Sequence, residues 1–598
     1  MGISMKTPVI TTAYNWCLFL FLFSYLLLRA FFNETLSDEA FSFLYYVEYG
    51  NFWGEKAHLD ANNHLLNSFL SILSYRASGE SHFFFVRLPN VLSFILYFWS
   101  VKRIADLITT SSIYRILILS AITCIPFIFE YFGFSRGYGL SMAFMTAGFY
   151  QLLLFQHNMK LKHFCFLLFF MTLSVYANLT LIITCLITIS YALLLIIFQA
   201  RKNIKLLLYS GLILLLFLPA LNPIFNFSQQ LRDGGALYYG SLNTLWESTV
   251  KSLLTYTVYS AQEWMFYPLL LILLTFAAYA FIALKREKQA AFIQPSAFFI
   301  WVLAGNLVAI ELMAKILHIN YPSDRVGMHL IIIFLFTFSS VFSQLRYGQY
   351  VLFLLVFFPV NFLFKLNLHS STVSPYDRMT RSFYRQIMEK SDKYSYITMH
   401  PLEFLNYSIH SRTNNHPLIA EPTEQQKLTP DLVVVFKEQE HYLIDSGLYE
   451  KVAEDELKYH VAYKRSKPRS RSLILKESFD TNRNTDEFIR IDMRTIPDSV
   501  RNADLLFHFE ALMECPNQEP GSLFVSFSFF DKEGVVHEYS GIPLQWIFGK
   551  QNAFRINYNN VQTAPGEQIT EWRILLWNKE RQPISLKNTS FELYRLAE

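Results

Sequence analysis

The sequence predicts a polytopic α-helical membrane protein with a soluble C-terminal region, and three observations support this. Of 598 residues, 53% are hydrophobic and 16% are charged, and the mean hydropathy is +0.25. This composition lies outside the range of soluble globular proteins. Several apolar runs reach the roughly 20 residues that a helix needs to cross about 30 Å of hydrocarbon. After about residue 367 the composition becomes that of a water-soluble protein.

The apolar runs predict about eleven membrane helices. The first run, Tyr14–Phe32, follows Lys6 as a signal peptide would, but it is longer than a signal's apolar core and no small-x-small cleavage site follows it. We therefore expect this run to be retained as the first helix. The predicted helices cover 10–31, 85–104, 113–132, 138–156, 163–178, 180–199, 205–222, 265–284, 297–316, 327–344 and 349–366.

Short basic segments predict the orientation of these helices, because Lys- and Arg-rich loops stay in the cytoplasm. With a cytoplasmic amino terminus and an odd number of crossings, the following all fall on the cytoplasmic side: Lys102/Arg103, Lys160/Lys162, Arg201/Lys202/Lys205, Lys285/Arg286/Lys288 and Arg346. The exocytoplasmic side then receives the loop 33–84, the link Gly133–Gly137, the loop 223–264, the link 317–326 and everything after 367.

Three domains are expected. A transmembrane domain covers 1–366, and its outer loop 33–84 contains interfacial helices; a small α/β region covers 367–470, and a β-sandwich covers 471–598. Within the outer loop, the helical pattern over 63–73 is too short to span and is typical of a helix lying in the interface. The loop 223–264, rich in Tyr and Trp, is interpreted in the same way.

The soluble region has its own periodic patterns. An amphipathic helix over Arg381–Lys390 and an apolar run over 432–436 predict the α/β region. The basic stretch 466–471 indicates a linker, and the alternation in 523–529 predicts strands of a sandwich. Three tryptophans in the last domain could stack on sugar rings, with core packing as the alternative: Trp546, Trp572 and Trp577.

Cysteine usage and net charge exclude two classes of protein. The five cysteines are scattered and four of them lie in the apolar region, so no disulfide framework is implied: Cys17, Cys124, Cys165, Cys185 and Cys515. The net charge of +4 is too small to indicate a nucleic-acid partner.

Two adjacent carboxylates, Asp38 and Glu39, directly follow the first apolar run. A charged side chain just outside a membrane helix still needs contact with water or an oppositely charged partner. If the segment is helical, neighbouring side chains point about 100° apart, so one carboxylate faces a site and the other supports it. The alternative is a capping box in which Ser37 caps an interfacial helix.

Two arginines are predicted at the outer ends of helices. Arg136 precedes the helix that begins near 138, and Arg325 precedes the one that begins near 327. The helix macrodipole favours an anion at such positions. Together with Asp38/Glu39 and His64, the arginines indicate a site where a carboxylate acts on an anionic substrate. The alternatives are snorkelling for the arginines, a structural role for His64, and interfacial anchoring for Arg87.

Several motifs, taken in order, resemble the C-type glycosyltransferase (GT-C) superfamily. They are Asp38-Glu39-Ala40, Asn62-Asn63-His64-Leu65-Leu66, Val86-Arg87-Leu88-Pro89-Asn90-Val91-Leu92, Ser135-Arg136-Gly137-Tyr138-Gly139-Leu140 and Tyr321-Pro322-Ser323-Asp324-Arg325. The resemblance covers roughly residues 10–365 and is nearest to bacterial relatives of dolichyl-phosphate-mannose protein mannosyltransferases and aminoarabinose transferases. The chain departs from that branch in its soluble tail and in having Asn-Asn-His where some members have Lys-Pro-Pro.

The resemblance implies an enzyme of the bacterial inner membrane that takes a sugar from a polyprenyl-phosphate carrier on the outer face. It implies Asp38 as general base with Glu39 beside it, or a role in metal binding as in some branches. No cofactor is certain, and a divalent metal is possible. The acceptor is a lipid, a glycan or a protein.

The remaining candidate residues follow from the same chemistry. A carboxylate base contributes a factor of about 10²–10⁴, and a cation aimed at the leaving phosphate contributes roughly 3–4 kcal/mol. We expect the donor phosphate to be bound by Arg136, Arg325 and His64. We expect support for the acceptor or the structure from Tyr138, Asp60 and Asn63.

Two other functions remain open. A transporter or flippase of lipid-linked sugars usually has ionisable residues near the midplane, on broken helices or inverted repeats. The sequence has no detectable repeat, and its charged candidates lie at the predicted outer boundary, which favours an enzyme. A non-catalytic envelope scaffold would leave Asp38 and Glu39 without a role.

Overall fold

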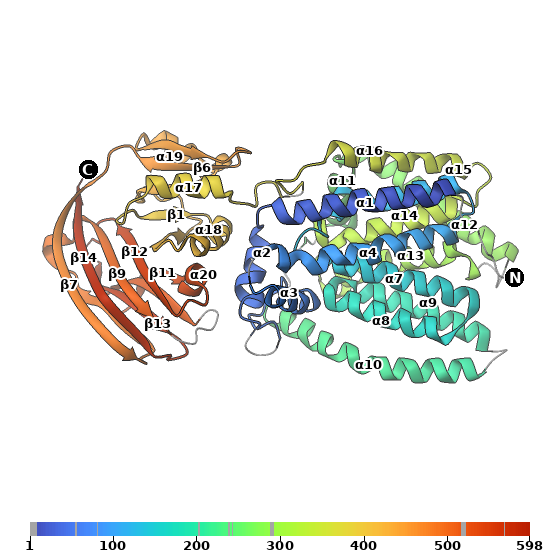
Figure 1. Cartoon of the computed structure of the whole chain (residues 1–598), viewed down its shortest axis with the longest axis horizontal. Coiled ribbons are helices and arrows are strands. Elements are labelled where there is room, and N and C mark those ends of the chain that lie inside the picture. Colours follow the sequence, from blue (N-terminus) through green and yellow to red (C-terminus); the bar gives the residue numbers. More distant parts are fainter. Residues whose placement is uncertain are drawn as a thin grey trace. The chain divides into compact units, whose positions relative to one another are not determined.

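The computed structural model divides the chain into two compact units (Figure 1). Unit 1 comprises Met1–Asn33 and Phe52–Val373, and unit 2 comprises Glu34–Asn51 and Ser374–Glu598. The segment Glu34–Asn51, which the sequence assigns to the outer loop of the membrane domain, thus clusters with the soluble region. The structure describes residues 9–53, 57–80, 82–200, 204–236, 240–241, 243–287, 292–372, 374–515, 522–566 and 568–597.

Unit 1 is helical, and within the described residues eight of its helices are long and apolar enough to cross a membrane. The predicted multi-pass character is confirmed, whereas the count of eleven crossings and their orientation stay predictions. Arg201, Lys202 and Lys288 lie outside the described residues. The eight helices are α1 (Val9–Phe32), α4 (Phe84–Ile108), α7 (Gly137–Asn158), α9 (Ile182–Ala200), α10 (Ile204–Asp233), α12 (Phe266–Glu287), α13 (Pro295–Leu317) and α14 (Met328–Phe342).

The other three predicted ranges are also helical but shorter. The range 113–132 is not one helix, because α5 (Ser112–Thr123) ends before Pro126, where α6 (Pro126–Glu130) begins. Proline cannot donate a backbone hydrogen bond and disfavours a helical residue before it, and Ile125 is accordingly extended. The other two are α8 (Leu161–Ala177) and the run α15 (Gly348–Val351), η7 (Leu352–Val356) and α16 (Phe357–Phe364), in which η7 is a 3₁₀ helix.

Both predicted outer loops contain short helices, as expected, and their place in the interface stays a prediction. In the first loop, α2 (Ser37–Ser42) continues into a π-helical turn, η1 (Phe43–Val47), and α3 (Leu65–Ala77) follows. The second loop contains the π-helical η3 (Leu245–Val250) and α11 (Lys251–Val258).

Arg87 binds the end of α1. Its guanidinium is 2% exposed and donates to the carbonyls of Ala30 (3.0 Å) and Asn33 (2.7 Å). These are carbonyls that the end of a helix leaves unsatisfied. Arg87 therefore joins the beginning of α4 to the end of α1.

Unit 2 contains a mixed α/β sheet. Strand β1 runs parallel to β3 and β4, while β6 is antiparallel to β4 and β5. Its strands, in order, are β3 (Glu421–Pro422), β1 (Ile397–Met399), β4 (Leu432–Phe436), β6 (His460–Arg465) and β5 (Tyr449–Glu454). The helices are α17 (Arg381–Lys390), α18 (Pro401–Asn414) and α19 (His441–Ser446).

The strand-rich C-terminal region is confirmed and forms two further sheets (Figure 1). Both contribute to one apolar core, where the rings of Phe507 and Phe527 lie 4.9 Å apart. One sheet has the order β11 (Val536–Pro543), β10 (Leu523–Asp531), β13 (Ile569–Asn578) and β8 (Phe488–Thr495). The other has the order β2 (Leu418–Ile419), β12 (Ala553–Gln562), β9 (Asp504–Glu514), β14 (Ile584–Ala597) and β7 (Ser470–Asn484).

The α/β region and the two-sheet region are joined closely. Strand β2 comes from the α/β region and pairs with β12, and the stretch predicted as a linker contains the buried Arg469, which donates to the carbonyl of Thr429 (2.6 Å).

Trp572 is 1% exposed and donates to Asp492, so its ring is unavailable to a sugar.

Candidate functional site

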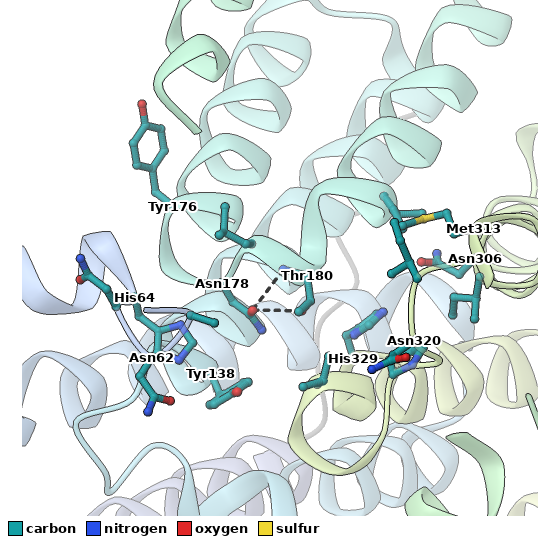
Figure 2. A pocket seen from close by; sticks show the side chains of 18 of the residues that line it. Asn62, His64, Tyr138, Tyr176, Asn178, Thr180, Asn306, Met313, Asn320 and His329 are labelled. Atoms are coloured by element: carbon teal, nitrogen blue, oxygen red, sulfur yellow. Dashed lines mark hydrogen bonds between the residues drawn. The ribbon is translucent and has the colours of Figure 1, made fainter. Parts of the chain in front are cut away.

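A cavity of about 220 Å³ lies inside unit 1 (Figure 2). Its wall comes from the beginning of α3, the beginning of α7, the α8–α9 junction, α13 and the segment before α14. The polar or aromatic lining residues are Asn62, Asn63, His64, Tyr138, Tyr176, Asn178, Thr180, Asn306, Asn320 and His329. Three candidates from the sequence, Asn63, His64 and Tyr138, thus lie on one wall.

Arg136 reaches this wall through Asn62. Its Nη2 donates to Asn62 Oδ1 over 2.7 Å, and the side chain is 2% exposed. The guanidinium carbon lies 5.9 Å from the ring centre of Tyr138, whose ring meets that of His64 edge-on at 4.9 Å. A buried cation and two polarisable rings therefore stand together at this end of the cavity.

Asparagine side chains fix the turn that carries Arg136. Asn67 Nδ2 donates to the carbonyl of Ser135 (3.2 Å), and Asn90 Oδ1 accepts from the backbone N–H of Leu140 (3.1 Å). Asn90 also donates to Asn67 over 2.5 Å. The two amides, one from α3 and one from α4, thus hold both ends of the turn into α7.

Gly137 allows the close packing of this turn. A Cβ atom at Gly137 would lie 1.9 Å from the carbonyl oxygen of Ala177 and 2.7 Å from His64. Contacts this short cannot exist, so only glycine lets α7 begin against both His64 and the end of α8. Packing therefore requires the glycine of the Arg136-Gly137-Tyr138 motif.

Asp60 and Asn63 make local hydrogen bonds, and the supporting role expected of them stays a prediction. Asp60 Oδ1 accepts from the backbone N–H of Asn62 (2.7 Å), which forms an Asx turn. Asn63 donates to the carbonyl of Phe52 (2.7 Å) and accepts from Ser68 Oγ (3.0 Å). These bonds set the backbone that presents Asn62 and His64 to the cavity.

Arg325 lies in a 3₁₀ turn, η6 (Asp324–Gly327), directly before α14. Its neighbours Pro322 and Val326 line the cavity, whereas Arg325 itself is not among the lining residues that the structure describes. Arg325 is near Tyr131, whose ring lies 5.1 Å from that of Tyr138.

Asn178 and His329 are two cavity residues that the sequence analysis missed. Asn178 Oδ1 accepts from the backbone N–H and the hydroxyl of Thr180, at 3.2 and 3.0 Å (Figure 2). Within the described structure, Asn178 Nδ2 and His329 Nδ1 are buried and have no hydrogen-bond partner. Polar residues inside long apolar runs are the signal that could have identified them.

Several helix amino termini meet at the cavity. His64 is the N-cap of α3, Arg136 is the N-cap of α7, and Asn178 is the N-cap of η2 (Leu179–Leu181), the 3₁₀ turn that leads into α9. Each terminus has N–H groups without helical partners and a partial positive charge. The cavity end near Arg136 is therefore suited to an anion.

A second, apolar groove lies on a neighbouring face of α13 and α14. It has a volume of about 560 Å³ and its lining is almost entirely apolar, including Leu303, Leu307 and Phe334. Asn306 and Ile310 face the polar cavity, so adjacent stripes of α13 line the two spaces.

Asp38 and Glu39 belong to unit 2, in α2. Glu39 is 0% exposed, and its Oε2 accepts from the backbone N–H of Leu36 (3.3 Å). Asp38 is half-buried. Leu36 rather than Ser37 is the N-cap, and the Ser37 N–H donates to Asp377 (2.9 Å). Glu39 thus caps the helix, and Asp38 is the more accessible carboxylate.

Among the described residues, no group of three or more His, Cys, Asp or Glu side chains is arranged to hold a metal ion. The five cysteines are free thiols.

No family model and no curated protein matches this chain. Among solved structures, ArnT from Cupriavidus metallidurans in the apo state has a TM-score of 0.45 and 10% identity, covering 76% of this chain and 97% of that chain. ArnT bound to undecaprenyl phosphate has a TM-score of 0.36 and 11% identity, covering 76% and 98%. The arabinosyltransferase EmbB from Mycobacterium smegmatis has a TM-score of 0.31 and 9% identity, covering 100% of this chain and 65% of its own. The chain is similar, at low identity, to these two GT-C glycosyltransferases.

Proposed function

We propose that this chain is a membrane glycosyltransferase that moves a hexosyl or pentosyl group, with inversion, from a polyprenyl-phosphate donor to a lipid, glycan or protein acceptor. One observation carries the proposal: a polar cavity with an anion-favouring end and an apolar groove are both lined by α13 and α14. The chain would act in the bacterial inner membrane with its amino terminus cytoplasmic and its C-terminal region exocytoplasmic.

The two spaces match the two parts of such a donor. A polyprenyl phosphate has a long hydrocarbon tail and an anionic head. Apolar surface buried in the groove stabilises binding by roughly 25 cal/mol per Å², while the head requires cations and N–H donors. Arg136 and the amino termini of α3 and α7 supply these at the neighbouring cavity.

The reaction then needs little more than positioning and charge. The acceptor hydroxyl oxygen forms a bond to the anomeric carbon while the bond from that carbon to the phosphate oxygen breaks, and the phosphate leaves with that electron pair. We propose that Arg136, His64 and Arg325 stabilise the phosphate, each cationic contact by about 3–4 kcal/mol. We propose that Asp38 takes the proton of the acceptor hydroxyl, because Glu39 already serves as a helix cap. This last assignment is tested separately from the cavity.

Binding of undecaprenyl phosphate to the purified full chain in nanodiscs tests the phosphate site. Arg136→Ala and Arg325→Ala should each weaken binding by about 10- to 100-fold, as expected for a charge-assisted hydrogen bond. Arg346→Ala is the control, because Arg346 is exposed and lies after α14, at the other end from Arg325. If both variants bind like the control, the phosphate-site assignment is wrong.

Transport is distinguished by the products. A glycosyltransferase leaves free polyprenyl phosphate and a lengthened acceptor, whereas a flippase leaves the donor chemically intact. Mass spectrometry of surface glycans in a deletion strain separates them: a missing sugar supports transfer, and accumulation of complete precursor on the inner leaflet supports flipping.

A further inference from the structure

We propose that the cavity selects a donor whose sugar is uncharged, and that it disfavours amino sugars that carry a positive charge. This inference rests on the proposed function and names the sugar class for the same site. Three features support it: two buried side chains with open hydrogen-bonding capacity, the absence of carboxylates and ammonium groups among the described lining residues, and a small volume.

The open hydrogen-bonding groups are deep in the wall. Asn178 is 3% exposed and His329 is 4% exposed, and both line the cavity (Figure 2). Neither Asn178 Nδ2 nor His329 Nδ1 has a partner within the described structure. A buried polar group without a hydrogen bond is costly and rare, so these two atoms call for a ligand or for water.

A hydroxyl group complements both atoms. The Asn178 oxygen is occupied by Thr180, so the side chain offers only N–H donors to the cavity. The Nδ1 atom of a neutral imidazole donates or accepts, depending on the tautomer. A sugar hydroxyl accepts from the amide and donates to, or accepts from, the ring nitrogen, whereas an ammonium group can only donate and cannot pair with Asn178.

The charges near the cavity disfavour a cation. Of the described residues that line it, none is Asp, Glu, Lys or Arg. Two charged side chains reach the wall at Asn62: the guanidinium of Arg136 donates to the Asn62 side chain, and the carboxylate of Asp60 accepts from the Asn62 backbone N–H without itself lining the cavity. A cationic sugar would lose its hydration without gaining a carboxylate partner and would meet a like charge.

The volume indicates one sugar ring. About 220 Å³ is below the roughly 300–1,000 Å³ of cavities that hold drug-sized ligands. Tyr138 lines the cavity and contributes apolar surface for the C–H face of a ring, whereas the ring of Tyr176 stacks on Trp53. A single monosaccharide unit, with hydroxyls toward Asn178 and His329, matches this cavity.

The test uses matched donors that differ at one group. Binding to the full chain in nanodiscs is measured for bare undecaprenyl phosphate and for three pairs linked to it: glucose and glucosamine, mannose and mannosamine, galactose and galactosamine. In at least one pair the neutral sugar should bind about three- to tenfold more tightly than the bare carrier. Its amino counterpart should show no such gain.

Asn178→Asp changes only the half of the side chain that has no hydrogen-bond partner in the described structure, which is the amide nitrogen. The retained Oδ1 still accepts from Thr180, while the N–H donors become a carboxylate oxygen. In this variant the donor with the neutral sugar should no longer bind more tightly than the bare carrier. The donor with the amino sugar should bind more tightly than it does to the natural chain. Asn158→Asp is the matched control, since Asn158 Oδ1 likewise accepts from the N–H two residues ahead (Lys160, 3.0 Å) but is exposed at the far end of α7.

His329→Leu gives a second readout, because an apolar side chain at an unpaired buried site should not impair folding. This variant should bind the donor with the neutral sugar less tightly than the natural chain does, without a change in affinity for the bare carrier. Three outcomes would overturn this inference but not the proposed function. The neutral and amino sugars could bind equally, or no sugar could bind more tightly than the bare carrier, as expected if water fills the cavity. Asn178→Asp and Asn158→Asp could also have equal effects. Failure of the bare carrier to bind would overturn the proposed function and the inference with it.

Discussion

The guanidinium of Arg29 lies 3.2 Å from the carboxylate of Glu130, and both side chains are at most 4% exposed. Glu130 also accepts from the side chains of Ser371 and Thr372. Breaking one half of a buried ion pair costs about 3–5 kcal/mol, because the remaining charge is left uncompensated. We expect Arg29→Met and Glu130→Gln each to lower the thermal stability of the detergent-solubilised chain strongly.

The double variant Arg29→Met/Glu130→Gln should lose less stability than the sum of the two single variants, since neither charge is then left alone. Arg232→Ala is the control, because Arg232 and Asp233 form a pair that is 68% and 57% exposed. Exposed pairs contribute about 0–1 kcal/mol, so this variant should melt like the natural chain. Simple additivity of the two buried substitutions would contradict the pairing.

Gly137→Ala should prevent correct packing of α7. The new methyl group would meet the carbonyl of Ala177 at 1.9 Å, and overpacking typically costs about 1–3 kcal/mol even at less severe contacts. Gly211→Ala in α10 is the matched control, because nothing lies within 4 Å of its Cβ position and alanine favours a helix by up to about 1 kcal/mol. Scanning fluorimetry should show a lower melting temperature for Gly137→Ala only.

Asp38→Asn should abolish sugar transfer while leaving expression and folding unchanged, because an amide cannot accept the proton of the acceptor. Glu39→Gln should instead affect the order of α2, since Glu39 accepts from the N–H of Leu36. Radiolabelled transfer in membranes, normalised to protein, measures the first effect, and proteolysis near α2 measures the second. Full transfer by Asp38→Asn removes Asp38 as the base.

A buried acid in unit 2 should make part of that unit sensitive to pH. Glu403 Oε1 lies 3.2 Å from His460 Nε2, with His400 and the Asp455–Arg378 pair nearby. Burial raises the pKa of Glu403 to about 8, and burial, with a smaller effect of Arg378, lowers the pKa of His460 to about 4. Near neutral pH both groups are therefore uncharged, with the proton on Glu403.

The sign of the pH effect follows from proton binding. From the unfolded pKa of about 4.3 up to about 8, folded Glu403 holds a proton that the unfolded chain has released, so stability falls as pH rises. Between about 4 and 6.5, His460 has the opposite effect, because the unfolded chain binds the extra proton. Only the Glu403 effect remains between pH 6.5 and 8, where it amounts to between about 1 and 2 kcal/mol, because folded Glu403 is half ionised at pH 8.

Hydrogen exchange of α18 peptides, measured relative to β13 peptides of the same unit, checks this effect. In the natural chain the relative protection of α18 should fall by up to roughly 15-fold from pH 6.5 to 8. Glu403→Gln, which cannot titrate, should show no such fall. The same pH dependence in both proteins would assign it to another group.

Local patterns predicted those parts of the fold that local forces determine. The helices follow from apolar runs, and even the break in 113–132 was encoded by Pro126. Association of residues 34–51 with unit 2 was not predictable, because it depends on contacts such as Glu48 with Arg412, 364 positions apart. The short strand β2 likewise pairs with β12 far along the chain.

The site was predictable to the same extent. The motifs around His64 and Tyr138 bring these residues to one cavity, because their helices begin there. Asn178 and His329 lie in apolar surroundings without a motif, so only the packed structure shows that both face the same space. Arg325 lies next to residues that line the cavity, but it is not among the described lining residues itself.

The turn that begins η2 also affects the cost of binding. Thr180 holds the Asn178 amide through two hydrogen bonds, so its orientation is set before any ligand arrives. Immobilising a free polar side chain on binding typically costs about 0.5–1.5 kcal/mol of conformational entropy. Asn178 has already lost this freedom on folding, so a ligand that bonds to its nitrogen retains more of the bond's free energy as affinity.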